Sequence, residues 1–280
     1  MSTTSETEIF TGDRSIRFKN LIIGILKRAN LTSEHIARYT TADNMAIFSQ
    51  AFTAASADDT VNYEMFEQLG DVTANKFIVW YMYRRFPQLR HPLGVKVVAR
   101  LRINYGARQT FNEIGERLGF WDFISASVDD RSRKKKDLLE DCVESIIGAI
   151  EFIIDNDSRP GVGNAVAYDI LKSVFDELEI SLEYEELYDA KTRLKELFDF
   201  HKGELGKLVY TKTRDEETGI FRSVVNIQGG DAKVSRYYGT GTATKLKDAE
   251  QHSASRLLEI LKGCGISKPV PIEYAMFNTK

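Results

Sequence analysis

Cysteine is scarce in this chain, with only Cys142 and Cys264 among 280 residues. So few thiols exclude a disulfide framework and a cysteine-based zinc site, and they are typical of a reducing intracellular compartment. Long apolar runs are lacking too, since none approaches the roughly 20 residues needed to cross a bilayer. Residues 1–13 are rich in Ser, Thr and Glu and have neither the basic start nor the apolar stretch of a secretory signal. We therefore expect a soluble cytoplasmic protein without a membrane segment.

An excess of positive charge is also missing. The chain has 38 Lys and Arg against 41 Asp and Glu, a net charge of -3. The balance differs along the sequence, because residues 186–268 contain 15 Lys and Arg against 12 Asp and Glu, which leaves 23 against 29 elsewhere. A slightly basic C-terminal part thus follows an acidic part. That distribution suits a polyanion-binding unit joined to a carboxylate-rich site.

Hydrophobic periodicity divides the chain into two parts. Apolar residues recur at three- and four-residue spacing through most of residues 16–200, which predicts helices, with breaks at Pro87, Pro92 and Pro160-Gly161. The second part begins with the last of these helices, over 190–200. It continues with predicted strands over 207–214, 221–227 and 234–238, a turn at 215–219 and a helix over 249–261. The sequence therefore predicts an all-α domain followed by a small α+β domain of order α-β-β-β-α.

Two acidic sets stand at helical spacing beside apolar stretches. Glu64, Glu67 and Asp71 form one set, and Asp141 and Glu144 form the other, so each set occupies one helix face. Small residues that allow two helices to approach closely share these faces, namely Gly70, Ala74, Ser145 and Gly148. Carboxylates brought together there repel unless a cation intervenes, and oxygen donors without His or Cys favour Mg²⁺ or Mn²⁺. From spacing alone, solvated surface acids remain the alternative.

The same segments resemble a known family. Residues 64–71, EMFEQLGD, resemble the signature motif of the ribonuclease III family, and residues 138–150, LLEDCVESIIGAI, resemble its second motif at a suitable separation. Residues 189–196 are similar to the first helix of the family's double-stranded RNA-binding domain. Residues 241–251 resemble the loop and helix start that hold an RNA phosphate backbone.

This resemblance covers roughly residues 18–261 and implies a domain division. The implied parts are a flexible tail over 1–13, an all-α ribonuclease III catalytic domain over 14–183, a linker over 184–188, a double-stranded RNA-binding domain over 189–264 and a C-terminal tail over 265–280. The family works as a homodimer through the catalytic domain, so a homodimer is expected here.

The resemblance also implies roles for individual residues. Carried over to this sequence, the catalytic residues are Asp71 and Glu144 with Glu64 in a supporting role, and the metal ligands are Glu67, Asp141 and Glu144. The implied cofactor is Mg²⁺, with Mn²⁺ as a substitute. The implied reaction is attack of a metal-activated water on double-stranded RNA, giving 5′-phosphate and 3′-hydroxyl ends with short 3′ overhangs. The implied RNA-binding residues of the second domain are Lys195, Glu196, Lys245 and Lys247.

Some positions depart from the family pattern. Gln68 replaces a Phe that packs into the partner subunit, which predicts a weaker dimer, and Leu246 and the acidic turn at 215–217 predict weaker RNA binding. The basic run over 131–136 either approaches RNA or is a solvated loop. A second functional hypothesis is a catalytically silent RNA-binding or ribosome-associated protein on this scaffold. Such proteins usually lose one or more of the acids, and all five are present here, which favours the enzyme.

Overall fold

The computed structural model describes residues 8–106 and 108–277, which form two compact units. The first unit ends at Ile180 and the second begins at Ser181, close to the boundary predicted after residue 183. Within the described part of the chain, none of the helices has the length and apolar character needed to cross a membrane.

The first unit is helical almost throughout, as the apolar spacing predicts. Its elements are β1 (Ile9–Phe10), α1 (Ile16–Lys27), α2 (Ser33–Tyr39), α3 (Ala42–Gln50), α4 (Glu64–Arg85), η1 (Pro87–Leu89), α5 (Gly94–Tyr105), α6 (Arg108–Arg117), η2 (Phe120–Phe123), β2 (Ala126–Ser127), α7 (Val128–Arg133), α8 (Lys135–Asp157) and α9 (Val162–Phe175). Ser15, Thr32 and Thr41 begin the first three helices, because each side-chain oxygen accepts a backbone N–H of the first turn. Helix α4 ends just before Pro87, where a proline cannot continue it.

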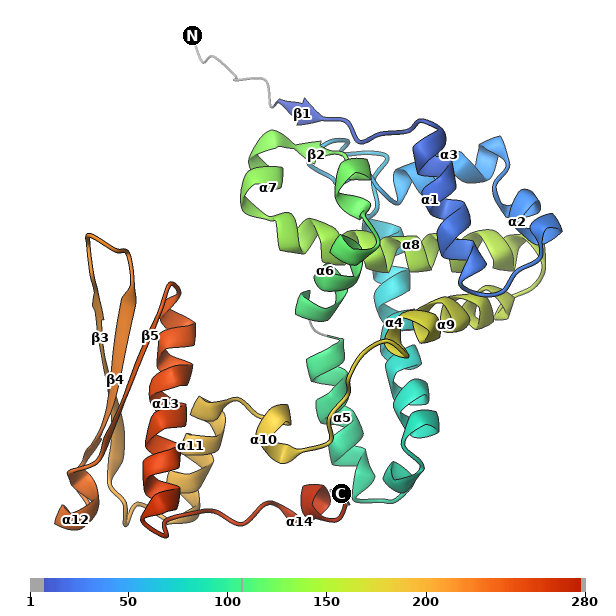
Figure 1. The fold of residues 1–280 in the computed structure, drawn as a ribbon. Helices are drawn as coiled ribbons and strands as arrows, with labels where there is room; N and C mark the ends of the chain where they lie inside the picture. Colours follow the sequence, from blue (N-terminus) through green and yellow to red (C-terminus); the bar gives the residue numbers. More distant parts are fainter. Residues whose placement is uncertain (1–7, 107, 278–280) are drawn as a thin grey trace. The chain divides into compact units, whose positions relative to one another are not determined.

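Helices α4 and α8 cross at the centre of this unit and are its longest elements (Figure 1). Helix α8 is buried along most of its length, from Leu138 to Ile154. Beside this pair, the Phe18 ring of α1 meets the Phe52 ring edge-on, with centroids 5.1 Å apart, and Phe52 meets Phe120 at 5.0 Å. The core therefore holds the segment around Phe52, which precedes α4, in a fixed place.

The N-terminal segment differs from the flexible tail predicted over 1–13. Residues 1–7 lie outside the described residues, but β1 pairs antiparallel with β2. Gly12 donates its N–H to Ser125 Oγ at 3.0 Å, and Asp13 donates its N–H to the Asp122 carbonyl at 3.0 Å. Partners more than one hundred positions away in the sequence, both backbone and side chain, order this segment. No local pattern in the sequence could indicate them.

The second unit is an antiparallel sheet of order β3-β4-β5 with α11 and α13 packed on one face (Figure 1). Its elements are α10 (Tyr184–Leu187), α11 (Ala190–Phe200), β3 (Lys207–Arg214), β4 (Phe221–Gln228), α12 (Ala232–Ser235), β5 (Tyr238–Ala243), α13 (Leu246–Gly263) and α14 (Ile272–Ala275). The first two predicted strands and both predicted helices are confirmed. The turn at 215–219 is confirmed as well, since the Asp215 carboxylate accepts two backbone N–H groups within it and Gly219 has φ 69°.

The strand predicted over 234–238 is wrong in position. Residues 232–235 form the short helix α12, begun by the Asp231 side chain, and the third strand β5 starts at Tyr238. A Cβ at Gly239 would lie 2.0 Å from the Ser253 carbonyl oxygen of α13. Close approach of the helix therefore selects a glycine-containing strand, which β-propensity alone disfavours.

The predicted linker over 184–188 and the predicted tail over 265–280 are both partly structured. Tyr184 lies in α10 and is buried, and Tyr274 lies in α14 and is buried too. The hydroxyl oxygens of Tyr188 and Tyr274 are 2.7 Å apart, and the Tyr184 and Tyr274 ring centroids are 5.4 Å apart. This aromatic contact orders two segments that are distant in sequence. Residues 278–280 of the predicted tail lie outside the described residues.

Candidate active site

Two glycines bring α4 directly against α8 at the level of the acidic sets. A Cβ at Gly70 would lie 1.8 Å from the Glu144 carbonyl oxygen, and a Cβ at Gly148 would lie 2.1 Å from the Phe66 carbonyl oxygen. Neither position accepts a methyl group unless a backbone moves. The stripe of small residues thus acts as predicted: it allows the acidic face of α4 to lie beside that of α8.

The five predicted acids form one electrostatic group. Burial, together with the charges of Asp71, Glu67 and Asp141, raises the pKa of Glu144 to about 8. Burial also raises the pKa of Glu67 to about 7, with contributions from Asp141, Glu64 and Asp71. The alternative of solvated surface acids does not hold for Glu144, which is 8% exposed. A buried group of like charges with raised pKa values is typical of a functional site that takes up a cation.

Three further residues belong to this group and were not predicted from the sequence. Tyr63 donates its hydroxyl to Asp141 Oδ2 at 2.9 Å, and Asn75 donates its amide to Asp71 Oδ1 at 2.7 Å. Glu140 adds negative charge that raises the pKa of both Glu67 and Glu144. Asn75 follows Asp71 by one helical turn, so its spacing could have identified it. Tyr63 is recognised only from the tertiary contact.

A small pocket of about 160 Å³ opens beside these acids. Its lining residues are Ala54, Ala55, Ser56, Tyr63, Glu64, Glu67, Asp130, Lys134, Asp137, Leu138 and Asp141. Three of the five predicted acids line it, whereas Asp71 interacts by its charge with Glu67, and Glu144 with Glu67 and Asp141. Lys134 contributes a positive group to this wall, and its Nζ lies 2.8 Å from Asp130 Oδ1.

The donor set fits a hard divalent cation. Among residues 8–106 and 108–277, no three carboxylate, His or Cys groups already stand close enough together to hold a metal ion. The chemistry is nevertheless suitable, because the available donors are carboxylate oxygens whose negative charges repel one another. Glu67, Asp141 and Glu144 remain the predicted residues that would hold such an ion.

The predicted RNA-binding residues of the second unit divide into two groups. Lys195, Lys245 and Lys247 are exposed, and Lys245 and Lys247 flank the first residue of α13. Glu196 instead accepts hydrogen bonds from the Tyr184 hydroxyl and from Lys268 Nζ, the latter at 2.5 Å. Because those contacts already engage its carboxylate, we leave Glu196 out of the proposed RNA surface.

The basic run over 131–136 spans the end of α7 and the start of α8, with Lys134 between the two helices. The Arg131 guanidinium lies 3.9 Å from the Phe10 ring centroid and 3.8 Å from that of Trp121, and it donates to the Ile124 and Trp121 carbonyls. Arg133, Lys134 and Lys135 form ion pairs with neighbouring acids. Arg131 therefore stabilises the fold. The prediction of a solvated loop is wrong for it.

Comparisons with known proteins found similar chains. Residues 64–152 match the family model of the ribonuclease III domain. Over 266 residues the chain is 42% identical to a protein of Invertebrate iridescent virus 6 with a provisional ribonuclease 3 name, and the match covers 90% of each chain. A similarly named protein of Frog virus 3 (isolate Goorha) is 38% identical over 77% of this chain and 56% of its own length. The ribonuclease 3 of Legionella pneumophila (strain Lens) is 31% identical over 79% of this chain and 93% of its own. The solved nuclease domain of ribonuclease III from Campylobacter jejuni is 25% identical over 56% of this chain and 99% of its own, with a TM-score of 0.43.

Proposed function

This chain belongs to the ribonuclease III family, and on that premise we propose that it hydrolyses phosphodiester bonds of double-stranded RNA with Mg²⁺ as cofactor. The observation that carries the proposal is the contact of α4 with α8, which brings five carboxylates, the buried Glu144 among them, into one group. Such a group is unfavourable without a cation, and a nuclease uses that cation on its substrate.

The five acids take different roles in this proposal. Glu67, Asp141 and Glu144 hold the ion, and Tyr63 keeps Asp141 in place through its hydroxyl. When bound, Mg²⁺ supplies an activated water and neutralises the charge that develops on the phosphoryl oxygen. Asp71, oriented by Asn75, and Glu144 act on the attacking water, and Glu64 supports the set. The expected products carry 5′-phosphate and 3′-hydroxyl ends.

We further propose that the chain works as a homodimer through α4. One face of this helix exposes large apolar side chains along most of its length. They are Met65 (77% exposed), Leu69 (37%), Val72 (59%), Val79 (42%), Trp80 (47%) and Tyr83 (45%). An apolar stripe of this length is typical of a protein interface, and a symmetric dimer would cover it with the same stripe of a second copy. The dimer would contain two acidic sites, one from each copy. If each site cuts one strand of the duplex, the products carry the short 3′ overhangs.

In this proposal, the second unit and the acidic site both bind the RNA duplex. Double-stranded RNA presents phosphates and 2′-hydroxyls rather than base edges, so recognition rests on charge and shape. Lys245 and Lys247 stand at the N-terminus of α13, where the helix dipole adds to their charge, and Lys195 is exposed on α11. These contacts make affinity fall with salt.

The test is incubation with a long duplex RNA of random sequence, with Mg²⁺ or with a chelator, followed by sizing and end analysis of the products. We expect short duplexes with 5′-phosphates in Mg²⁺ and intact RNA in chelator. Binding without any cleavage in Mg²⁺ or Mn²⁺ would instead support the catalytically silent alternative. The presence of all five acids speaks against that alternative.

A further inference from the structure

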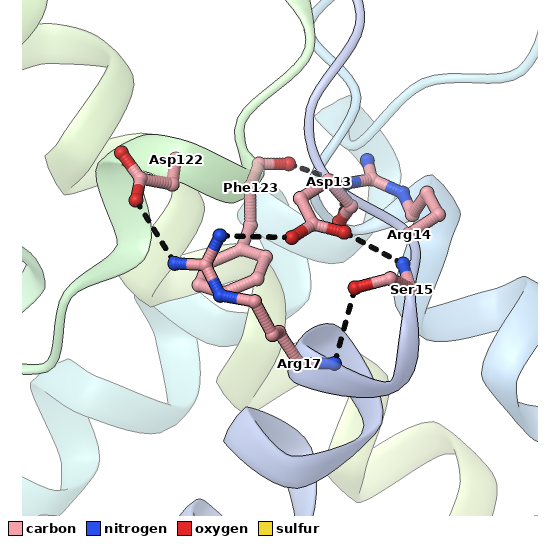
Figure 2. Close-up of polar contacts among 6 residues, drawn as sticks. All are labelled: Asp13, Arg14, Ser15, Arg17, Asp122 and Phe123. Carbon is pink, nitrogen blue, oxygen red and sulfur yellow. Dashed lines mark hydrogen bonds and ion pairs between the residues drawn. The ribbon is translucent and has the colours of Figure 1, made fainter.

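Arg14 lies outside both acidic sets, yet it makes one of the densest polar networks in the first unit. Its Nε donates to Ser49 Oγ at 2.7 Å. Its two terminal nitrogens donate to the carbonyls of Phe123, Phe52 and Ser49, and to Ser125 Oγ. Figure 2 shows the bond to Phe123, which joins the N-terminal segment to the last residue of η2. The guanidinium is partly buried, and burial lowers its pKa.

One of the carbonyls held by Arg14, that of Phe52, belongs to the loop that leads into α4. The Phe52 carbonyl also accepts the Ser125 N–H at 2.8 Å, and Ala54 donates its N–H to the Ser125 carbonyl at 2.8 Å. Thr53 forms an isolated parallel bridge with Ser125. The same loop continues into the wall of the acidic pocket at Ala54. Arg14 therefore bonds both to this short segment, at Phe52, and to Ser125, which pairs with the segment.

Two hydrogen bonds of Tyr63 connect this segment to a proposed metal ligand. The Thr53 carbonyl accepts the Tyr63 N–H at 2.9 Å, and the Tyr63 hydroxyl donates to Asp141 Oδ2 at 2.9 Å. A displacement of Thr53 would thus move Tyr63, and with it the group that orients Asp141.

We propose that Arg14 is a positioning residue for the active site, acting on Asp141 through the 52–54 loop and Tyr63. The inference deepens the proposed function and rests on it, because it assigns a distant residue to the placement of a ligand used in that reaction. Partners of metal ligands commonly set metal affinity by fixing ligand orientation.

The chemistry of the side chain explains why an arginine stands there. Its planar guanidinium donates in several directions at once, and the acceptors come from two separate stretches of chain, residues 49–52 and 123–125. A lysine would keep the charge but could not reach all of these acceptors together. Arg14→Lys therefore removes most of these hydrogen bonds while keeping the positive charge of the side chain.

Arg17 is a matched control on the same segment. It pairs with Asp13 at 3.1 Å and with Asp122 at 3.3 Å, and its side chain is 63% exposed (Figure 2). These contacts tie the N-terminus to η2 without touching the 52–54 loop. A general loosening of the N-terminus would appear in Arg17→Met, whereas a loss of positioning would not.

The experiment compares the full chain with its Arg14→Lys, Tyr63→Phe and Arg17→Met variants. It also includes the double variant that combines Arg14→Lys with Tyr63→Phe. The readouts are the Mg²⁺ concentration for half-maximal cleavage, Mn²⁺ binding by calorimetry without RNA, and the melting temperature in chelator. We expect Arg14→Lys and Tyr63→Phe each to raise the half-saturating Mg²⁺ about tenfold and to weaken Mn²⁺ binding similarly. The double variant should be no worse than either single one, and Arg17→Met should match the parent.

An Arg14→Lys protein with a lower melting temperature but unchanged metal dependence would overturn the proposal, as would additive effects in the double variant. If Arg14→Lys does not fold, Ser49→Ala removes one acceptor and should raise half-saturating Mg²⁺ about threefold. No change in a folded Ser49→Ala protein would then overturn it. Failure of the parent to cut duplex RNA would refute the proposed function instead, and the Mn²⁺ calorimetry would still decide the role of Arg14.

Discussion

The Glu144 carbonyl oxygen faces Gly70 so closely that no side chain fits between the two helices that carry them. This contact sets the distance between the two acidic sets. A methyl group at residue 70 must push the helices apart, which changes both the stability of the core and the arrangement of the carboxylates.

We therefore predict that Gly70→Ala lowers the free energy of unfolding by about 1–3 kcal/mol and weakens cleavage. Urea unfolding and the cleavage rate measure the two effects. Gly24→Ala is the control, since Gly24 lies within α1 with open space around it, and alanine there should stabilise by about 0.5–1 kcal/mol. Equal behaviour of the two variants would contradict the close helix contact.

Glu144→Gln should reduce cleavage by at least about 100-fold, because it removes a charged ligand while keeping the shape of the side chain. Duplex binding should stay within about twofold, since affinity rests on phosphate contacts elsewhere. Product sizing and a filter-binding assay at equal Mg²⁺ separate these effects. Glu113→Gln changes an exposed acid of α6 and should leave both unchanged. Parental cleavage by the Glu144 variant would remove this residue from the site.

The raised pKa of Glu144 predicts how stability depends on pH without metal. The folded protein keeps a proton on Glu144 up to pH about 8, whereas an unfolded chain releases it near 4.5. Between those values the folded state binds more protons, so the free energy of unfolding falls as pH rises. Glu67, with a pKa of about 7, acts in the same direction.

In chelator, Glu144→Gln should therefore melt higher than the parent at pH 8.5, by about 2 °C or more. The two proteins should melt together at pH 5, where the parental carboxyl is protonated. Thermal unfolding followed by circular dichroism measures this, and Mg²⁺ should stabilise the parent more than the variant at pH 8.5. A parent that gains stability between pH 5 and 8.5 would show that Glu144 ionises freely.

Replacing Lys245 and Lys247 together by Ala should weaken duplex binding and lower the slope of log affinity against log salt by about 2, one for each phosphate contact. Lys262→Ala, near the other end of α13, is the matched control. A chain ending at residue 188 should bind weakly at moderate salt yet keep slow cleavage at low salt. An unchanged salt slope in the double variant would place the RNA surface elsewhere.

Val72→Arg should convert a dimer to a 31.8 kDa monomer and reduce cleavage of both strands together, because a buried charge in an apolar interface is strongly unfavourable. Sedimentation velocity gives the mass, and the cleavage assay gives the activity. Ile16→Arg, on α1, replaces another exposed apolar residue (68% exposed) and should leave the mass unchanged. A parent that is monomeric with full activity would rule out the α4 interface.

Local pattern alone determined much of this protein. Helical spacing and prolines gave the helices of the first unit, and β-branched runs gave two of three strands in the second. The acidic sets on α4 and α8 and the glycines between them were visible in sequence, because both acids and small residues repeat with the period of a helix. The predicted position of the third strand was wrong. Its glycines are required by close packing against α13, and strand propensity does not indicate them.

Tertiary structure decided what depends on distant partners. The order of residues 8–13, the bond from Tyr63 to Asp141 and the network of Arg14 all join residues separated by dozens of positions. The engagement of Glu196 by Lys268 likewise has no local signal. Sequence periodicity reports which side of an element a residue occupies. Only the packed chain determines which other element meets that side, and therefore which polar groups are held, freed or brought into the active site.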